Sequence, residues 1–147
     1  METEEKKVPV YQDLIDEITN ELVNRKSTYG QFHPSVAESL NSIALVHLHM
    51  LQNPDEALKY HIEACGILLV VFRNEYENMG KKDKEELSIA LAVTYSDIGN
   101  AKWALEDLEG ADAFYRKALE TLHLEKLPES HPRAYSIRNR ISALHRH

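Results

Sequence analysis

The chain has 147 residues, of which 43% are hydrophobic and 28% are charged, and its formal net charge is −7 at pH 7. This length and hydrophobic content suit one domain with a buried core. An acidic chain lacks the concentrated basic surface that nucleic acids and anionic membranes require, so we expect neither as a general partner.

No segment has the pattern of a targeting or membrane-spanning sequence. The longest nearly apolar run, 66–72, is far too short to span a bilayer, and the first ten residues lack the apolar centre of a signal peptide. The single cysteine, Cys65, lies between apolar neighbours, which indicates a buried thiol in a reducing compartment. We therefore expect an intracellular, cytoplasmic protein without membrane insertion.

Apolar residues recur at helical spacing along almost the whole chain, and no segment alternates with period two over a useful length. The sequence therefore predicts an all-α fold, with a flexible N-terminus over 1–7 and one helical domain over 8–147. The helices are expected at about 8–26, 34–51, 54–78, 83–104, 107–123 and 132–146.

Residues that favour helix starts stand at several of these boundaries. Ser35 with Glu38, and Asp83 with Glu86, match the capping box, in which two side chains satisfy free backbone N–H groups. Asn53 precedes a Pro-Asp-Glu run and is a strong N-cap signal. These signals separate the expected helices from one another.

Two stretches of the chain are nearly the same. The stretches from His33 to His47 and from His131 to His145 both begin with His-Pro, carry Asn at the ninth position and Ile at the eleventh, and end in His. A third, weaker copy lies between them. Such copying is typical of a repeat architecture.

Small residues recur together with the repeat. Ala44 in the first copy and Gly99 in the second stand where two helices of one unit would meet, and Ala57 and Ala111 follow in the next helix. Small side chains let two helix axes approach closely, so this pattern predicts helical hairpins.

The spacing from Gly99 to Ala111 to Ala118 and the His-Pro openings resemble the tetratricopeptide (TPR) repeat, in the longer variety found in kinesin light chains. The resemblance covers about 34–145. It implies a right-handed α-solenoid of about three TPR-like hairpins.

The chain departs from the family pattern in two places. Glu106 stands at a turn position that is normally Gly, and no Gly or Pro separates the helices expected before and after it, so one continuous helix stays possible there. The last unit stops after its first helix, which is either a cap or part of a longer array.

The resemblance also implies a concave groove lined by the first helix of each unit. In the family, groove positions lie one, five and eight residues past the first large residue of a unit. They correspond here to Asn41, Leu45 and Leu48 with His49 beside them, to Ser96, Asn100 and Trp103, and to Asn139 with Arg140 beside it.

Two of these residue types admit two interpretations. An Asn amide both donates and accepts, so the three Asn could pair with the backbone of a bound peptide or could bond a neighbouring helix. Trp103 could anchor a side chain of the partner or pack between helices. The middle unit also carries Asp97, which would repel a C-terminal carboxylate, so the carboxylate clamp of chaperone-binding TPR domains is not expected.

His47 and His61 are expected to form a buried neutral pair, and two His without a third ligand do not make a zinc site. The chain has no Gly-rich phosphate loop, nucleophile elbow or His-Glu metal motif. We therefore expect no metal, no cofactor and no enzymatic activity.

The resemblance implies a protein–protein interaction module, a scaffold or adaptor that binds a partner peptide or helix in the concave groove. The alternative is self-association, as a homodimer, or docking within a larger assembly through the solenoid ends, because an uncapped end exposes an apolar helix face.

Overall fold

The computed structural model describes residues 4–146, which form six α-helices and one short 3₁₀ helix. No strand occurs in these residues, so the expected all-α class is confirmed. The helices are α1 (Glu4–Tyr29), α2 (Pro34–His49), α3 (Pro54–Glu75), η1 (Tyr76–Asn78), α4 (Lys81–Ala104), α5 (Leu108–His123) and α6 (Pro132–His145).

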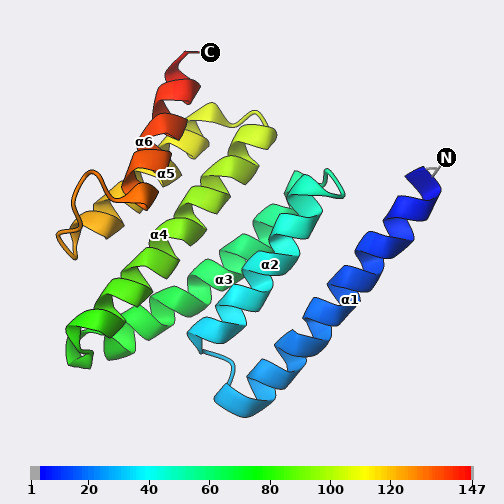
Figure 1. Ribbon diagram of the computed structural model, residues 1–147, viewed down its shortest axis with the longest axis horizontal. Helices are drawn as coiled ribbons and strands as arrows, with labels where there is room; N and C mark the ends of the chain where they lie inside the picture. The colour runs from blue at the N-terminus through cyan, green and yellow to red at the C-terminus, as the bar shows by residue number, and fades with distance from the viewer. Residues whose placement is uncertain (1–3, 147) are drawn as a thin grey trace.

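The helices follow one another side by side from α1 at one end of the molecule to α6 at the other (Figure 1). Each packs mainly on its neighbours in the chain: α2 pairs with α3, and α4 pairs with α5. The fold is therefore a TPR-like helical solenoid with two complete hairpins, flanked by α1 and by α6.

The repeated His-Pro pair has a local structural cause. His33 and His131 are the N-caps of α2 and α6, and their Nδ1 atoms accept hydrogen bonds from the backbone N–H of Ser35 at 3.1 Å and of Arg133 at 3.2 Å. Histidine here takes the role that Ser, Thr or Asp usually has. Asn53 caps α3 as expected.

Three of the sequence-based expectations about helix ends were wrong. Residues 4–7 are part of α1 and do not form a segment before it, while residues 1–3 of the expected flexible N-terminus lie outside the described residues. The N-cap of α2 is His33, so the box at Ser35 does not start that helix. The helix expected from Asp83 begins at Lys81, and its N-cap, Gly80, makes no side-chain hydrogen bond.

The α4 and α5 helices are separate. Glu106, between them, has φ of 64°, the left-handed conformation that Gly adopts without strain, and Asp107 then caps α5 by accepting from the N–H of Gly110 at 2.9 Å. The chain thus makes the family's turn with an acidic residue where the family pattern has Gly.

Close packing at small residues holds the hairpins together, as the sequence pattern predicts. Ala44, Ala57 and Ala111 are completely buried. At Gly99 a Cβ atom would lie only 2.6 Å from Cε1 of the buried Tyr115 ring, which belongs to α5. The absence of a side chain at Gly99 is therefore what lets α5 lie so close to α4.

We predict that Gly99→Ala lowers the free energy of unfolding by about 1–2 kcal/mol, because the added methyl group forces the rigid Tyr115 ring to move. Gly66→Ala is the matched control: it also lies within a helix, but its Cβ would meet nothing within 4 Å, so a gain of about 0.5–1 kcal/mol is expected. Urea denaturation of both variants checks this, and equal effects of the two substitutions would contradict it.

Candidate functional site

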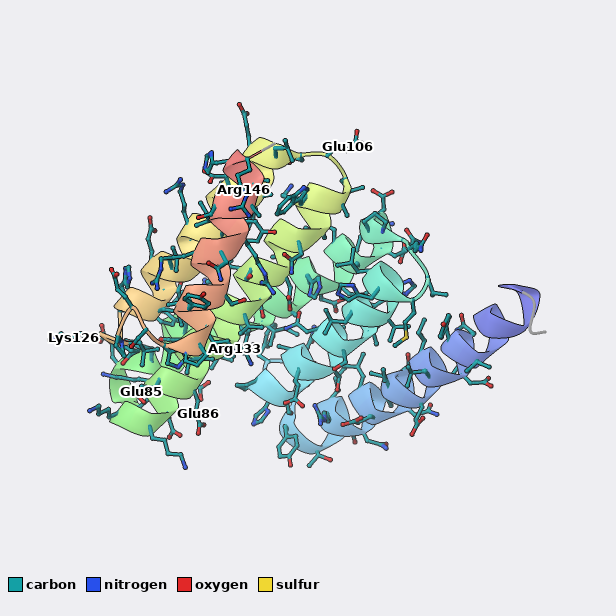
Figure 2. All side chains as sticks on the ribbon, turned by 45° about the horizontal axis from the view of Figure 1, so that its top comes forward. Glu85, Glu86, Glu106, Lys126, Arg133 and Arg146 are labelled. Atoms are coloured by element: carbon teal, nitrogen blue, oxygen red, sulfur yellow. The ribbon has the colours of Figure 1, made fainter. Side chains whose placement is uncertain are left out.

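A groove of about 530 Å³ lies between α2 and α4. Its apolar lining comes from α2, α3 and α4, and its polar lining includes Glu38 on α2, Glu86 and Asp97 on α4, and Arg133 on α6. Glu86 and Arg133 lie toward the same end of the molecule, near the starts of their helices (Figure 2). The apolar residues are Pro34, Ala37, Leu45, Leu68, Ile89, Ala90 and Val93.

Two of the residues predicted for partner binding line this groove, Asn41 and Leu45. Leu45 is 38% exposed, which is high for a leucine in a helix that packs on two others. Leu48 is half-buried and His49 exposed, and both lie beyond the groove toward the end of α2.

The Asn41 amide is bonded to two neighbouring helices. Its nitrogen donates to Oγ1 of Thr94 on α4 at 2.9 Å, and its oxygen lies 2.7 Å from Nδ1 of His61 on α3. Because the Asn oxygen can only accept, Nδ1 of His61 carries the proton. Of the two interpretations of Asn41, the geometry favours a bond between helices, since Thr94 and His61 are completely buried.

The other two Asn differ from Asn41. Asn100 accepts a hydrogen bond from the hydroxyl of the buried Tyr115 at 2.7 Å, which links α4 to α5 within the hairpin. Asn139 is exposed on α6. Trp103 contacts the Tyr115 ring edge-on, with centroids 6.5 Å apart, so it packs between α4 and α5.

Ser96 and Arg140 meet between α4 and α6. The guanidinium of Arg140 donates to Oγ of Ser96, which is itself buried. A small cavity of about 40 Å³ lies beside them and is also lined by Asp97 and Arg133. Since Asp97 and Arg133 line the larger groove too, this cavity adjoins the α6 end of that groove.

Burial raises the pKa of Asp97 to about 6, although the guanidinium groups of Arg140 and Arg133 act to lower it. Loss of hydration outweighs the two cations because neither makes a hydrogen bond to this carboxylate in the structure. Asp97 therefore changes its charge near neutral pH on the wall of the groove.

The expected pair of His47 and His61 does not form. Burial lowers the pKa of His61 to about 4, so it is neutral at physiological pH, and its Nε2 atom has no hydrogen-bond partner. His47 is half-buried and stacks on Tyr60, with ring centroids 5.5 Å apart. No hydrogen bond or ring contact joins the two histidines.

Sequence reasoning missed the groove residues Glu38, Ser42, Glu86, Ile89 and Val93. The family positions begin at Asn41 on α2 and at Ser96 on α4, whereas the groove lining begins earlier, at Pro34 and at Glu86. The α4 helix begins at Lys81, well before the counted positions. The spacing of Glu86, Ile89 and Val93 by three and four residues is the signal that could have placed one face of α4 in the groove.

A comparison with protein families matches residues 91–133 to the tetratricopeptide repeat. This span contains the second half of α4, all of α5 and the start of α6, and it includes Gly99 and Tyr115. Residues 91–133 therefore match a TPR-type repeat unit. The matching family is the kinesin-light-chain-like variety, as expected from the sequence.

TPR repeats generally mediate protein–protein interaction and are typically not enzymes. No curated protein matches the chain. Within the part of the chain that the structure describes, no helix is long and apolar enough to cross a membrane. In the same residues no three His, Cys, Asp or Glu side chains gather in a way that could hold a metal ion.

We predict that Asp97→Asn stabilises the fold at about pH 7.5 by about 1–2 kcal/mol and has little effect near pH 4. The folded pKa of about 6 lies above the unfolded value of about 3.9. The free energy of unfolding therefore falls as the pH rises from about 4 to about 6, and it stays lower above that range. Urea denaturation at both pH values measures the difference between variant and wild type.

Asp112→Asn is the control for this measurement. A hydrogen bond from Arg116 lowers the pKa of Asp112, so removal of its charge should destabilise the fold at neutral pH. His61 titrates in all three proteins, so its own contribution cancels in the comparison. Destabilisation by Asp97→Asn at about pH 7.5 would contradict the assignment of a raised pKa.

Proposed function

We propose that the chain is a non-enzymatic scaffold or adaptor that binds a peptide or helix of a partner protein in the groove between α2 and α4. The observation that carries this proposal is the partly exposed Leu45, which stands with Ile89 and Val93 along the groove. Apolar side chains left open between two helices are the usual anchor points for a bound segment.

The rigidity of the groove supports the same function. The hydrogen bond from Asn41 to Thr94 joins the two helices that form its walls, and Leu68 of α3 closes its floor. A groove that is already formed does not lose conformational freedom when a partner binds, so more of the contact energy is available as affinity.

This proposal changes the set of partner-binding residues that the sequence predicts. We assign Leu45 to direct contact, together with the groove residues Ile89 and Val93, and Asn41 to the support of the wall. Asn100 and Trp103 are assigned to packing within the α4–α5 hairpin.

The remaining predicted residues lie at the ends of the groove or outside it. Ser96 and Arg140 border its α6 end, where Arg140 holds Ser96. Leu48, His49 and Asn139 are assigned to the outer edges, where a longer partner segment would reach.

Self-association is the second candidate function. Tyr135 on α6 is 59% exposed, and it lies on the last helix of the array, where another unit would stack in a longer solenoid. Light scattering separates the two candidates, because an interface at α6 requires a dimer that Tyr135→Ser dissociates.

We predict that peptides selected from a displayed random library on the immobilised chain bind it in the groove. Leu45→Asp should weaken their affinity about tenfold or more, because it places a charge in the apolar anchor position. Titration by fluorescence anisotropy with the purified wild-type and variant chains measures the effect.

Ile62→Asp is the matched control for this substitution. Ile62 is 53% exposed on α3, and it is not part of the groove lining, so the same chemical change should leave peptide affinity within about twofold. Failure to enrich any peptide, or an equal loss of affinity in the two variants, would contradict the proposed function.

A further inference from the structure

The groove continues past the first turn of α2 into a second cavity of about 280 Å³. The two share Pro34, Glu86 and Ala90, so they form one path across the starts of α2 and α4. The second cavity adds Glu75 of α3 and Asp83 of α4 to the carboxylates already present in the groove. The carboxylates along the whole path are Glu38, Glu75, Asp83, Glu86 and Asp97.

Few cations of the chain itself face these carboxylates. Arg25 lies 3.7 Å from Glu38, but it is closer to Glu21, at 2.5 Å, and Glu38 keeps 73% of its side chain exposed. Among the described residues, no ion pair involves Glu86. Lys84, on the same helix as Glu86, does not pair with it: its Nζ atom lies over the Tyr76 ring, 4.9 Å from the ring centre.

The helix dipole does not account for the two acids on the groove walls. Acidic side chains are stabilised within the first turn of a helix, where Asp83 lies in α4. Glu38 and Glu86 both lie past the first turns of α2 and α4. Two like charges that face one apolar groove repel each other, and a cation bound between them would remove that repulsion.

The part of the groove beside Asp97 already has its cations from α6. Arg133 lines the groove beside Asp97, and Arg140 lines the adjoining cavity. Of the two acids on the groove walls, Glu38 shares Arg25 with Glu21, and Glu86 has no ion pair among the described residues. A basic side chain of a partner would provide for Glu38 and Glu86 what α6 provides beside Asp97.

We infer that the occupant of the groove is a basic amphipathic segment of another protein, with Lys or Arg on either side of a large apolar residue. The apolar residue would pack on Leu45 and Ile89, and the flanking cations would pair with Glu38 and Glu86. This inference rests on the proposed function, and it adds the chemistry of the partner.

A second copy of the chain fits less well. Its net charge of −7 opposes close approach of two chains, and two of the three arginines of α6 are engaged within the chain. Arg140 donates to Ser96, and Arg138 donates to the backbone oxygen of Glu129 at 2.5 Å. The acidic path therefore points to a partner of opposite charge.

Three short synthetic peptides with one Leu-Leu-Trp core test the inference. The core is flanked by Lys pairs in the first, by Ser pairs in the second and by Glu pairs in the third. Titration of the full chain should give an affinity for the Lys peptide about tenfold higher than for the Ser peptide, with the Glu peptide weakest. Added salt should reduce the advantage of the Lys peptide.

A charge-matched pair of double variants separates groove contacts from general attraction to an acidic protein. The E38Q/E86Q double variant should remove most of the advantage of the Lys peptide over the Ser peptide. The control double variant, E63Q/E120Q, changes two exposed glutamates on α3 and α5 that lie outside the groove, and it should retain that advantage. Thermal denaturation confirms that both double variants are folded.

The possible outcomes separate the inference of a basic partner from the proposed groove binding. If the two double variants lose the advantage equally, or if the Lys peptide binds no better than the Ser peptide, the inference of a basic partner is overturned. If the Ser or Glu peptide binds best and Leu45→Asp still abolishes that binding, the proposed function stands and only the charge inference fails. If no peptide binds to wild type, both are overturned.

Discussion

The hydrogen bonds of the Asn41 side chain hold three helices in register, and the groove depends on them. One amide joins α2 to Thr94 of α4 and to His61 of α3, and both of these partners are completely buried. Loss of one of these bonds would leave a buried polar group of Thr94 or His61 unsatisfied, which costs about 1–3 kcal/mol. The distance between α2 and α4 is therefore set by these hydrogen bonds as well as by side-chain packing. Leu45, Ile89 and Val93 are left open because that separation keeps the two helices from closing over them.

Close packing and open packing alternate along the array. Within the α4–α5 hairpin, the Tyr115 ring packs so closely on Gly99 that a Cβ there would lie 2.6 Å from Cε1 of the ring. Between α2 and α4 the chain leaves a groove, with α3 as its floor. The hairpins thus supply stability, whereas the space between successive first helices is the surface that we propose for a partner. The acidic residues on that surface, which TPR packing alone does not require, are the basis for the inferred preference for a basic partner.

Much of the fold could be predicted from the sequence, because its signals are local. Helical periodicity, the copied His-Pro openings and the small residues at Ala44, Gly99 and Ala111 identified the helices and the hairpins. The site was less predictable. Asn41 and Leu45 lie in the groove. The role of Asn41, however, depends on its hydrogen bond to Thr94, and nothing in the sequence indicates that these two distant residues meet. The acids Glu38 and Glu86 resemble solvent-exposed helix residues until α2 and α4 are placed side by side.

A double-mutant cycle on Asn41 and Thr94 tests the central claim most directly. Asn41→Ala and Thr94→Val are made singly and together, and the free energy of unfolding is measured for all four proteins. If the amide ties α2 to α4, the two effects are coupled by about 1 kcal/mol, because the second substitution removes a bond that the first has already broken. If the two effects simply add, Asn41 does not hold α2 against α4, and the groove owes its width to packing alone.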